Sequence, residues 1–212
     1  MRGRFVTFEG GEGAGKSTQA ALLTEALQRA GIAARLTREP GGSAGAEAIR
    51  QILLDGADER WDAIGEALLL NAARRDHVLH TILPALAEKT WIVCDRFADS
   101  TLAYQGYGRG LPLAKLTILQ QFTLGDLRPD LTLLLDLPVE EGLRRAARRP
   151  GSGDRFERLD REFHERLRRG FQDIAAADPQ RCVVIDAAGD RDGVHRAVLA
   201  AVSQRFGIGL AG

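Results

Sequence analysis

Hydrophobic residues along this chain gather in short segments, and longer stretches with helical spacing separate them. Most of the short segments are continuous apolar runs, which are typical of strands buried on both faces of a sheet. They predict strands at about 4–9, 33–37, 91–94, 131–135 and 182–185. The intervening stretches predict helices at about 15–30, 44–54, 60–87, 98–124, 139–148, 157–177 and 191–205. This alternation predicts an α/β fold with a five-stranded parallel sheet and helices on both of its faces.

Glycine and proline predict where the helical stretches end or break. Gly31 supplies a stop for the first helix, because glycine readily adopts the conformation that terminates a helix. Pro84 predicts a loop or kink inside 60–87, since proline cannot continue the backbone hydrogen-bond pattern. Residues 106–112 contain three glycines and a proline, and they predict a break inside 98–124.

The segments that directly follow the predicted strands hold the candidate chemistry. In open parallel sheets, ligands bind beyond the carboxyl ends of the strands. The residues at those positions are the glycine-rich segment 10–17, the segment 38–40, the pair 95–96 and Asp136. We therefore expect these four segments to meet at one edge of the sheet.

The segment after the first strand matches the phosphate-binding pattern G-x-x-x-x-G-K-[ST], and it is called the P-loop below. Its glycines allow successive backbone N–H groups to converge on an anion. Lys16 can reach the outer phosphates, and the Ser17 hydroxyl can ligate magnesium. The pattern therefore predicts a bound nucleoside triphosphate. The residues expected to bind it are Gly10, Gly11, Glu12, Gly13, Ala14, Gly15, Lys16, Ser17 and Thr18.

Asp95 is the better candidate for a second magnesium ligand. It ends a buried strand, which is where P-loop proteins place the aspartate that helps to hold the metal. Asp136 follows another apolar strand and fits the same pattern. Arg96 favours the first candidate, because a guanidinium beside it offers a fork for phosphate. Asp136 reads more simply as a strand-end residue that caps the next turn.

Length and composition limit the class of protein. A chain of 212 residues predicts one domain, and 29 Lys and Arg balance 29 Asp and Glu, so no overall charge favours nucleic acid or a membrane. No signal-peptide pattern and no run of membrane-spanning length is present. Cys94 and Cys182 lie in or beside apolar strands, which favours reduced core thiols and a cytoplasmic location.

Three segments resemble the signature sequences of thymidylate kinases. They are 8–18, which includes the P-loop, 37–42 with the sequence TREPGG, and 95–106 with the sequence DRFADSTLAYQG. Segments 71–74, 82–86 and 127–132 agree as well, so the resemblance extends from about residue 4 to 187. It implies the P-loop nucleoside monophosphate kinase fold, as a single domain over 1–212 with a short lid at about 147–157.

The resemblance also implies a reaction and a set of roles. ATP would donate its terminal phosphate to dTMP, with magnesium, and form dTDP for dTTP synthesis, and the enzyme would be a homodimer. Arg74 would lie near the thymine edge, Arg96 at the acceptor phosphate and Thr101 opposite the base. Tyr104 would crowd the sugar 2′ carbon, and Glu12 would meet the 3′-OH. The implied substrate-binding residues are Glu39, Pro40, Leu70, Arg74, Arg96, Ser100, Thr101, Tyr104 and Gln105.

A lid arginine completes the implied catalytic set. The P-loop has no arginine between Gly10 and Lys16, whereas the segment 144–155 is rich in arginine and is interrupted by glycine and proline. In the family such a lid closes over the phosphates and excludes water. The implied catalytic residues are Glu12, Lys16, Asp95, Arg96 and, from the lid, Arg149 or Arg155.

Some features depart from the family pattern or stay open. Leu70 stands where many members have a phenylalanine that stacks on the base, and Asp76 stands where glutamine is frequent. His77 has no metal-ligand spacing and reads as a helix-packing or surface residue.

Two other functions remain as alternatives. A deoxynucleoside kinase would share the P-loop, but two acceptor-side arginines fit a charged phosphate better than a neutral nucleoside. A regulatory GTPase would also share it, and 186–189 fits its D-x-x-G element. That match follows the last strand, however, and no Asn-Lys-x-Asp sequence for reading guanine is present.

Overall fold

The central element is a five-stranded sheet in which all neighbouring strands run parallel, as the sequence predicts. The computed structural model describes residues 2–54, 60–148 and 159–210. The strand order is β2-β3-β1-β4-β5, so β1 lies in the centre, between β3 and β4. The strands are β1 (Phe5–Glu9), β2 (Ala34–Arg38), β3 (Trp91–Asp95), β4 (Leu131–Asp136) and β5 (Cys182–Asp186).

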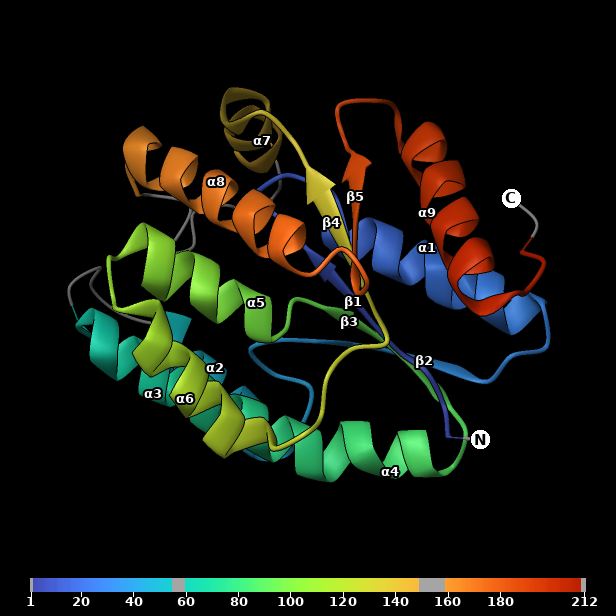
Figure 1. The fold of residues 1–212 in the computed structure, drawn as a ribbon, viewed down its shortest axis with the longest axis horizontal. Coiled ribbons are helices and arrows are strands. Elements are labelled where there is room, and N and C mark those ends of the chain that lie inside the picture. Colours follow the sequence, from blue (N-terminus) through green and yellow to red (C-terminus); the bar gives the residue numbers. More distant parts are fainter. Residues whose placement is uncertain (1, 55–59, 149–158, 211–212) are drawn as a thin grey trace.

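Helices cover both faces of this sheet (Figure 1). One face carries α1 (Lys16–Arg29) and α9 (Arg191–Phe206), which pack on each other. The α7 helix (Val139–Ala146) lies beyond the carboxyl end of β4. The layer on the other face consists of α2 (Ala44–Leu54), α3 (Ala63–His77), η1 (Val78–Ile82), α4 (Leu83–Ala87), α5 (Ala98–Thr101), η2 (Leu102–Gly108), α6 (Leu113–Leu124) and α8 (Arg161–Ala177).

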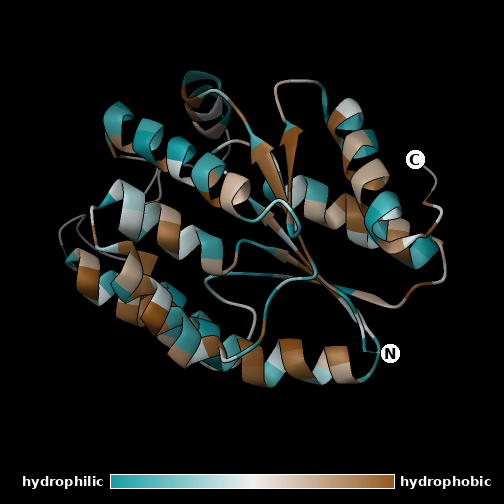
Figure 2. Cartoon of the chain, in the orientation of Figure 1, coloured by the Kyte–Doolittle hydropathy of each residue, from teal (hydrophilic) through white to brown (hydrophobic). Residues whose placement is uncertain are grey.

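Burial explains why the central strands are apolar throughout. All five residues of β1 are buried, because helices cover both sides of the strand. The strands are correspondingly hydrophobic in Figure 2, whereas the helices carry alternating polar and apolar bands. The edge strands are less covered, and Leu36 of β2 and Val184 of β5 are exposed. Cys94 and Cys182 are buried free thiols, as expected.

Two predicted helix breaks lie elsewhere. Pro84 stands in the first turn of α4, where a missing N–H is tolerated, and the irregularity comes before it, in the π-helical η1. The helix over 98–108 continues through Gly106 as the π-helical η2, so only 109–112 interrupt the chain before α6. A Cβ at Gly106 would come within 2.4 Å of a terminal methyl group of Leu113, so a side chain there would require Leu113 to move.

Across the described ranges, every helix is too short or too polar to cross a lipid bilayer.

Candidate active site

A cavity of about 480 Å³ opens at the carboxyl ends of the central strands. The P-loop, the end of β3 and the helices α2, α3 and η2 contribute to its wall. All nine residues for which the sequence predicts substrate binding border it, namely Glu39, Pro40, Leu70, Arg74, Arg96, Ser100, Thr101, Tyr104 and Gln105. Six predicted phosphate-binding residues border the same cavity, namely Glu12, Gly13, Gly15, Lys16, Ser17 and Thr18. Gly10, Gly11 and Ala14 shape the loop but do not border the cavity.

The P-loop has the conformation that its glycines permit. Gly10, Gly13 and Gly15 have φ values of 137°, 69° and 90°, which other residues rarely adopt. The α1 helix begins at Lys16, so its free N–H groups face the cavity end of the loop. The Lys16 ammonium donates to the carbonyl of Gly11 at 2.6 Å. Burial and repulsion by a neighbouring guanidinium lower the pKa of Lys16 to about 8.

The P-loop also packs directly against α7. A Cβ at Gly13 would lie 2.0 Å from the carbonyl oxygen of Gly142, which is in α7. A Cβ at Gly142 would lie 2.5 Å from the carbonyl oxygen of Glu12. Both clashes involve backbone atoms, so neither position has room for a side chain.

Ser17 and Asp95 form the candidate metal site. The Ser17 hydroxyl donates to one carboxylate oxygen of Asp95. The other oxygen, Oδ1, is buried and has no hydrogen-bond partner among the described residues. A buried carboxylate oxygen without a partner is costly, and it suits a hard cation such as magnesium. The described ranges contain no cluster of three or more His, Cys, Asp or Glu side chains that could hold a metal.

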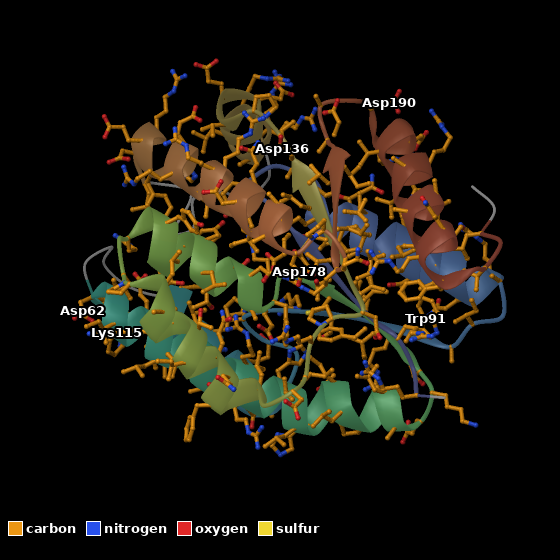
Figure 3. All side chains as sticks on the ribbon, in the orientation of Figure 1. Asp62, Trp91, Lys115, Asp136, Asp178 and Asp190 are labelled. Carbon is orange, nitrogen blue, oxygen red and sulfur yellow. The ribbon has the colours of Figure 1, made fainter. Side chains whose placement is uncertain are left out.

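Asp136, the competing candidate, lies outside the cavity lining. It stands at the tip of β4 (Figure 3), where it receives hydrogen bonds from Arg168 of α8 at 2.8 and 2.9 Å. Gln172 donates to the same carboxylate at 3.1 Å. The expectation that Asp136 caps the following turn is therefore wrong, because its oxygens pair with side chains of α8 instead.

A partly buried ion pair connects the end of β3 to the P-loop. The Arg96 guanidinium donates to Glu12 at 2.8 Å and to the carbonyl of Gly10 at 3.0 Å. The Tyr104 hydroxyl donates to the same oxygen of Glu12. Although burial opposes the charged form, Arg96 and Lys16 lower the pKa of Glu12 to about 2. Glu12 is thus a partly buried, ionised side chain, and not an exposed residue of a loop tip.

Glu9 holds the turn that carries Arg96. Arg96 has a φ of 69°, which is unfavourable for a residue with a side chain. The Glu9 carboxylate accepts hydrogen bonds from the backbone N–H of Phe97 at 2.8 Å and from the Ser100 hydroxyl at 2.6 Å. These bonds fix the chain on the far side of Arg96 and offset the strain at Arg96 itself. Burial and the nearby Asp99 raise the pKa of Glu9 to about 7.

A second buried network holds Arg74. Its Nε donates to Glu39 at 2.7 Å, and its terminal nitrogens donate to Thr101 at 2.9 Å and to the Phe97 carbonyl at 3.1 Å. The other Glu39 oxygen lies 3.0 Å from Nδ1 of His77. His77 is fully buried, so its reading as a surface residue is wrong and its reading as a packing residue holds.

Five further residues border the cavity, and the sequence predicts no substrate-binding role for any of them. They are Arg38, Arg50, Leu54, Phe97 and Arg145. Arg38 and Phe97 lie inside the two signature segments, so their position alone could have indicated them. Arg50 donates to the Pro40 carbonyl at 2.7 Å, and Arg145 donates to the Ala187 carbonyl at 3.0 Å. Arg145 lies in the arginine-rich segment 144–155, whereas Arg50 is brought to the site by long-range packing that no local pattern reveals.

The predicted lid at about 147–157 lies mostly outside the described residues. Arg149 and Arg155 belong to that part of the chain.

Comparison with known proteins gives a consistent result. The family model described as thymidylate kinase matches residues 8–198. A protein of Nitrobacter winogradskyi named thymidylate kinase is 56% identical, over 97% of this chain and 90% of its own length. One of Caulobacter vibrioides with the same name is 52% identical, over 98% of this chain and 99% of its own length. The crystal structure of thymidylate kinase from Ehrlichia chaffeensis superposes with a TM-score of 0.77 at 36% identity, covering 95% of this chain and 99% of that one.

The raised pKa of Glu9 predicts a pH-dependent stability. Its ordinary value of 4.5 becomes about 7 in the folded chain, so the folded state binds the proton more tightly than the unfolded state. The stabilisation from Glu9 is therefore complete below pH 4.5 and is lost as the pH rises through 7. We expect Glu9→Gln to gain thermal stability relative to the parent chain as the pH is raised from 5 to 8.

Thermal unfolding at one-unit pH steps measures this difference. Glu25→Gln, an equivalent change on the exposed side of α1, is the control and is expected to follow the parent chain. Parallel melting curves for Glu9→Gln and the parent chain across this pH range would contradict the assignment.

Proposed function

This chain belongs to the thymidylate kinase family, and from that membership we propose that it transfers the terminal phosphate of ATP to dTMP, forming dTDP. One observation supports the proposal above the others. The P-loop and the nine predicted acceptor residues border a single cavity, so a triphosphate and a nucleotide acceptor can meet there.

Phosphoryl transfer requires in-line placement and neutralised charge more than covalent chemistry by the protein. We propose that the P-loop N–H groups and Lys16 hold the ATP phosphates. Arg96, which contacts the P-loop through Gly10 and Glu12, binds the acceptor phosphate. An oxygen of that phosphate attacks the γ-phosphorus of ATP, the bond to the β–γ bridging oxygen breaks, and ADP leaves. Both cations are already in place before the ligands bind, which lowers the cost of reorganisation.

Glu12 would contribute through its charge and its position. Its low pKa keeps it ionised, so it accepts hydrogen bonds and does not donate. We propose that it accepts from the 3′-OH of the acceptor sugar, beside Tyr104, which crowds the 2′ carbon. The pair with Arg96 would meanwhile hold the guanidinium in the direction of the acceptor phosphate.

Magnesium is the implied metal, and Ser17 and Asp95 are the residues that would hold it. When bound, it neutralises the charge that develops on the β- and γ-phosphates.

The substrate assignment is tested with a panel of acceptors. We expect turnover of dTMP to exceed that of dUMP, UMP and thymidine in a coupled assay with ATP. A deoxynucleoside kinase would instead phosphorylate thymidine and leave dTMP unchanged. Lys16→Ala is the negative control, because it removes the P-loop cation. Faster turnover of UMP or dUMP than of dTMP would overturn the assignment.

A lid arginine is the second part of the proposal. The P-loop supplies no arginine, so we propose that Arg149 or Arg155 stabilises the phosphoryl group in transit. Replacing the responsible arginine by alanine is expected to lower kcat by about 10³-fold, the size of effect that such arginines have elsewhere. Arg29→Ala, an exposed change on α1, is expected to leave kcat unchanged. Near-normal turnover of both lid variants would show that the lid arginine is not needed.

We also propose a homodimer formed through α3, η1, α4 and α6. An apolar stripe runs along these helices, in which Phe122 is 90% exposed. The other exposed members of the stripe are Ile64, Leu68, Leu79, Leu83 and Ile118. Exposed large apolar side chains gathered on helices of one layer are typical of a subunit interface. A cytoplasmic location is proposed with it, which the buried free thiols favour.

Phe122→Asp tests the dimer. A charge at the most exposed position of the stripe is expected to give a monomer in sedimentation equilibrium at micromolar concentration, where the parent chain is a dimer. Val184→Asp places the same charge on the edge strand β5 and serves as the control. A monomeric parent chain, or a dimer that survives Phe122→Asp, would argue against this interface.

A further inference from the structure

The α3 helix carries a buried carboxylate that the phosphate chemistry does not use. Glu66 is fully buried. Its Oε2 accepts a hydrogen bond from Nε2 of Gln105 at 3.1 Å, and its Oε1 accepts one from Arg109 at 3.1 Å. A buried charge is stable only when such partners surround it, so these contacts are specific requirements of the site and not incidental ones.

Gln105 connects this carboxylate to the cavity. Its side chain is fully buried and borders the acceptor part of the cavity. Because a carboxylate can only accept, Glu66 must face the NH₂ group of the amide. The amide oxygen is thereby turned away from Glu66, and it has no hydrogen-bond partner among the described residues. A buried acceptor without a partner beside a binding cavity indicates a donor on the ligand.

We propose that Glu66 is a positioning residue that fixes the amide of Gln105 with its oxygen toward the acceptor base, so that the site selects a base whose ring nitrogen carries a hydrogen. The inference rests on the proposed function, because it takes the ligand of this cavity to be a pyrimidine nucleotide. The N3–H of thymine would donate to the Gln105 oxygen. Arg74, which borders the same cavity and has only donors, matches a base carbonyl.

Cytosine presents the opposite pattern. It has a bare N3 and an amino group, so it would place an acceptor against the Gln105 oxygen and a donor against Arg74. Leaving buried polar groups unpaired in this way is a strong basis for rejecting a ligand. Glu66 therefore contributes to base selection without touching the base.

Arg109 determines what happens when Glu66 is neutralised. In Glu66→Gln, the new amide oxygen must face the guanidinium of Arg109, because an NH₂ group there would meet another donor. The new NH₂ group then faces Gln105, whose amide must turn over to offer its oxygen. This rotation directs the NH₂ group of Gln105 into the cavity, where it suits cytosine and opposes thymine.

An exchange of the two residues restores the original pattern. In the double variant Glu66→Gln with Gln105→Glu, the amide oxygen at position 66 still accepts from Arg109. Its NH₂ group donates to the carboxylate at position 105, and the second carboxylate oxygen faces the cavity as an acceptor. In Gln105→Glu alone, two buried carboxylates face each other, which disfavours the arrangement.

Calorimetric affinities for dTMP and dCMP test the proposal, with folding checked by thermal unfolding. We expect Glu66→Gln to weaken dTMP binding by about 3- to 10-fold. The preference for dTMP over dCMP should fall by about 10-fold or more. The double variant should regain preference relative to Gln105→Glu alone. Glu25→Gln, a matched change on the surface of α1, should bind both nucleotides as the parent chain does.

Two results would overturn the inference. One is an unchanged preference in a folded Glu66→Gln variant. The other, which applies even if that variant does not fold, is a double variant that binds dTMP no better than Gln105→Glu alone. A parent chain that does not bind or phosphorylate dTMP would instead refute the proposed function itself, so the two failures are distinguishable.

Discussion

The site depends on one partly buried ion pair, between Arg96 at the end of β3 and Glu12 in the P-loop. Because β1 and β3 are neighbours in a parallel sheet, the loops that follow them emerge side by side. Lys16 and Arg96 therefore bring two positive charges into one partly buried space. Glu12 compensates them in the ligand-free chain, and its low pKa reflects that attraction. Without this carboxylate, the cations would repel each other until phosphate arrived.

Most of the remaining polar network supports that arrangement or its counterpart at Arg74. Glu9 accepts a hydrogen bond from the backbone N–H that follows Arg96, and Glu39 accepts one from the guanidinium of Arg74. Each arginine thus has a buried acid that fixes its direction before any ligand binds. A rigid arrangement of this kind suits phosphoryl transfer, where the position of charge matters more than the strength of a nucleophile.

The sequence predicted the fold well because the apolar runs and the helical stretches alternate clearly. The resemblance to thymidylate kinases also indicated the residues that border the cavity, and most of them belong to signature segments that follow strands with converging ends. Other features depend on distant partners. Arg50 and Glu66 gave no local signal, and His77 looked like any helical residue until its contact with Glu39 was visible. The end of the π-helical η2, residues 106–108, was missed because three glycines and a proline close together suggest a loop more strongly than a helix.

The contact between Gly13 and Gly142 restricts the P-loop more tightly than its own pattern does. In G-x-x-x-x-G-K-[ST], position 13 is one of the four that accept any residue. In this protein the backbone of α7 occupies the space that a side chain at Gly13 would need. The backbone of the P-loop likewise occupies the space that a side chain at Gly142 would need. A methyl group added at one of these glycines cannot be accommodated by a smaller residue at the other, because glycine is already the smallest residue. Each of the two positions therefore requires glycine in its own right, for as long as α7 keeps its place against the P-loop.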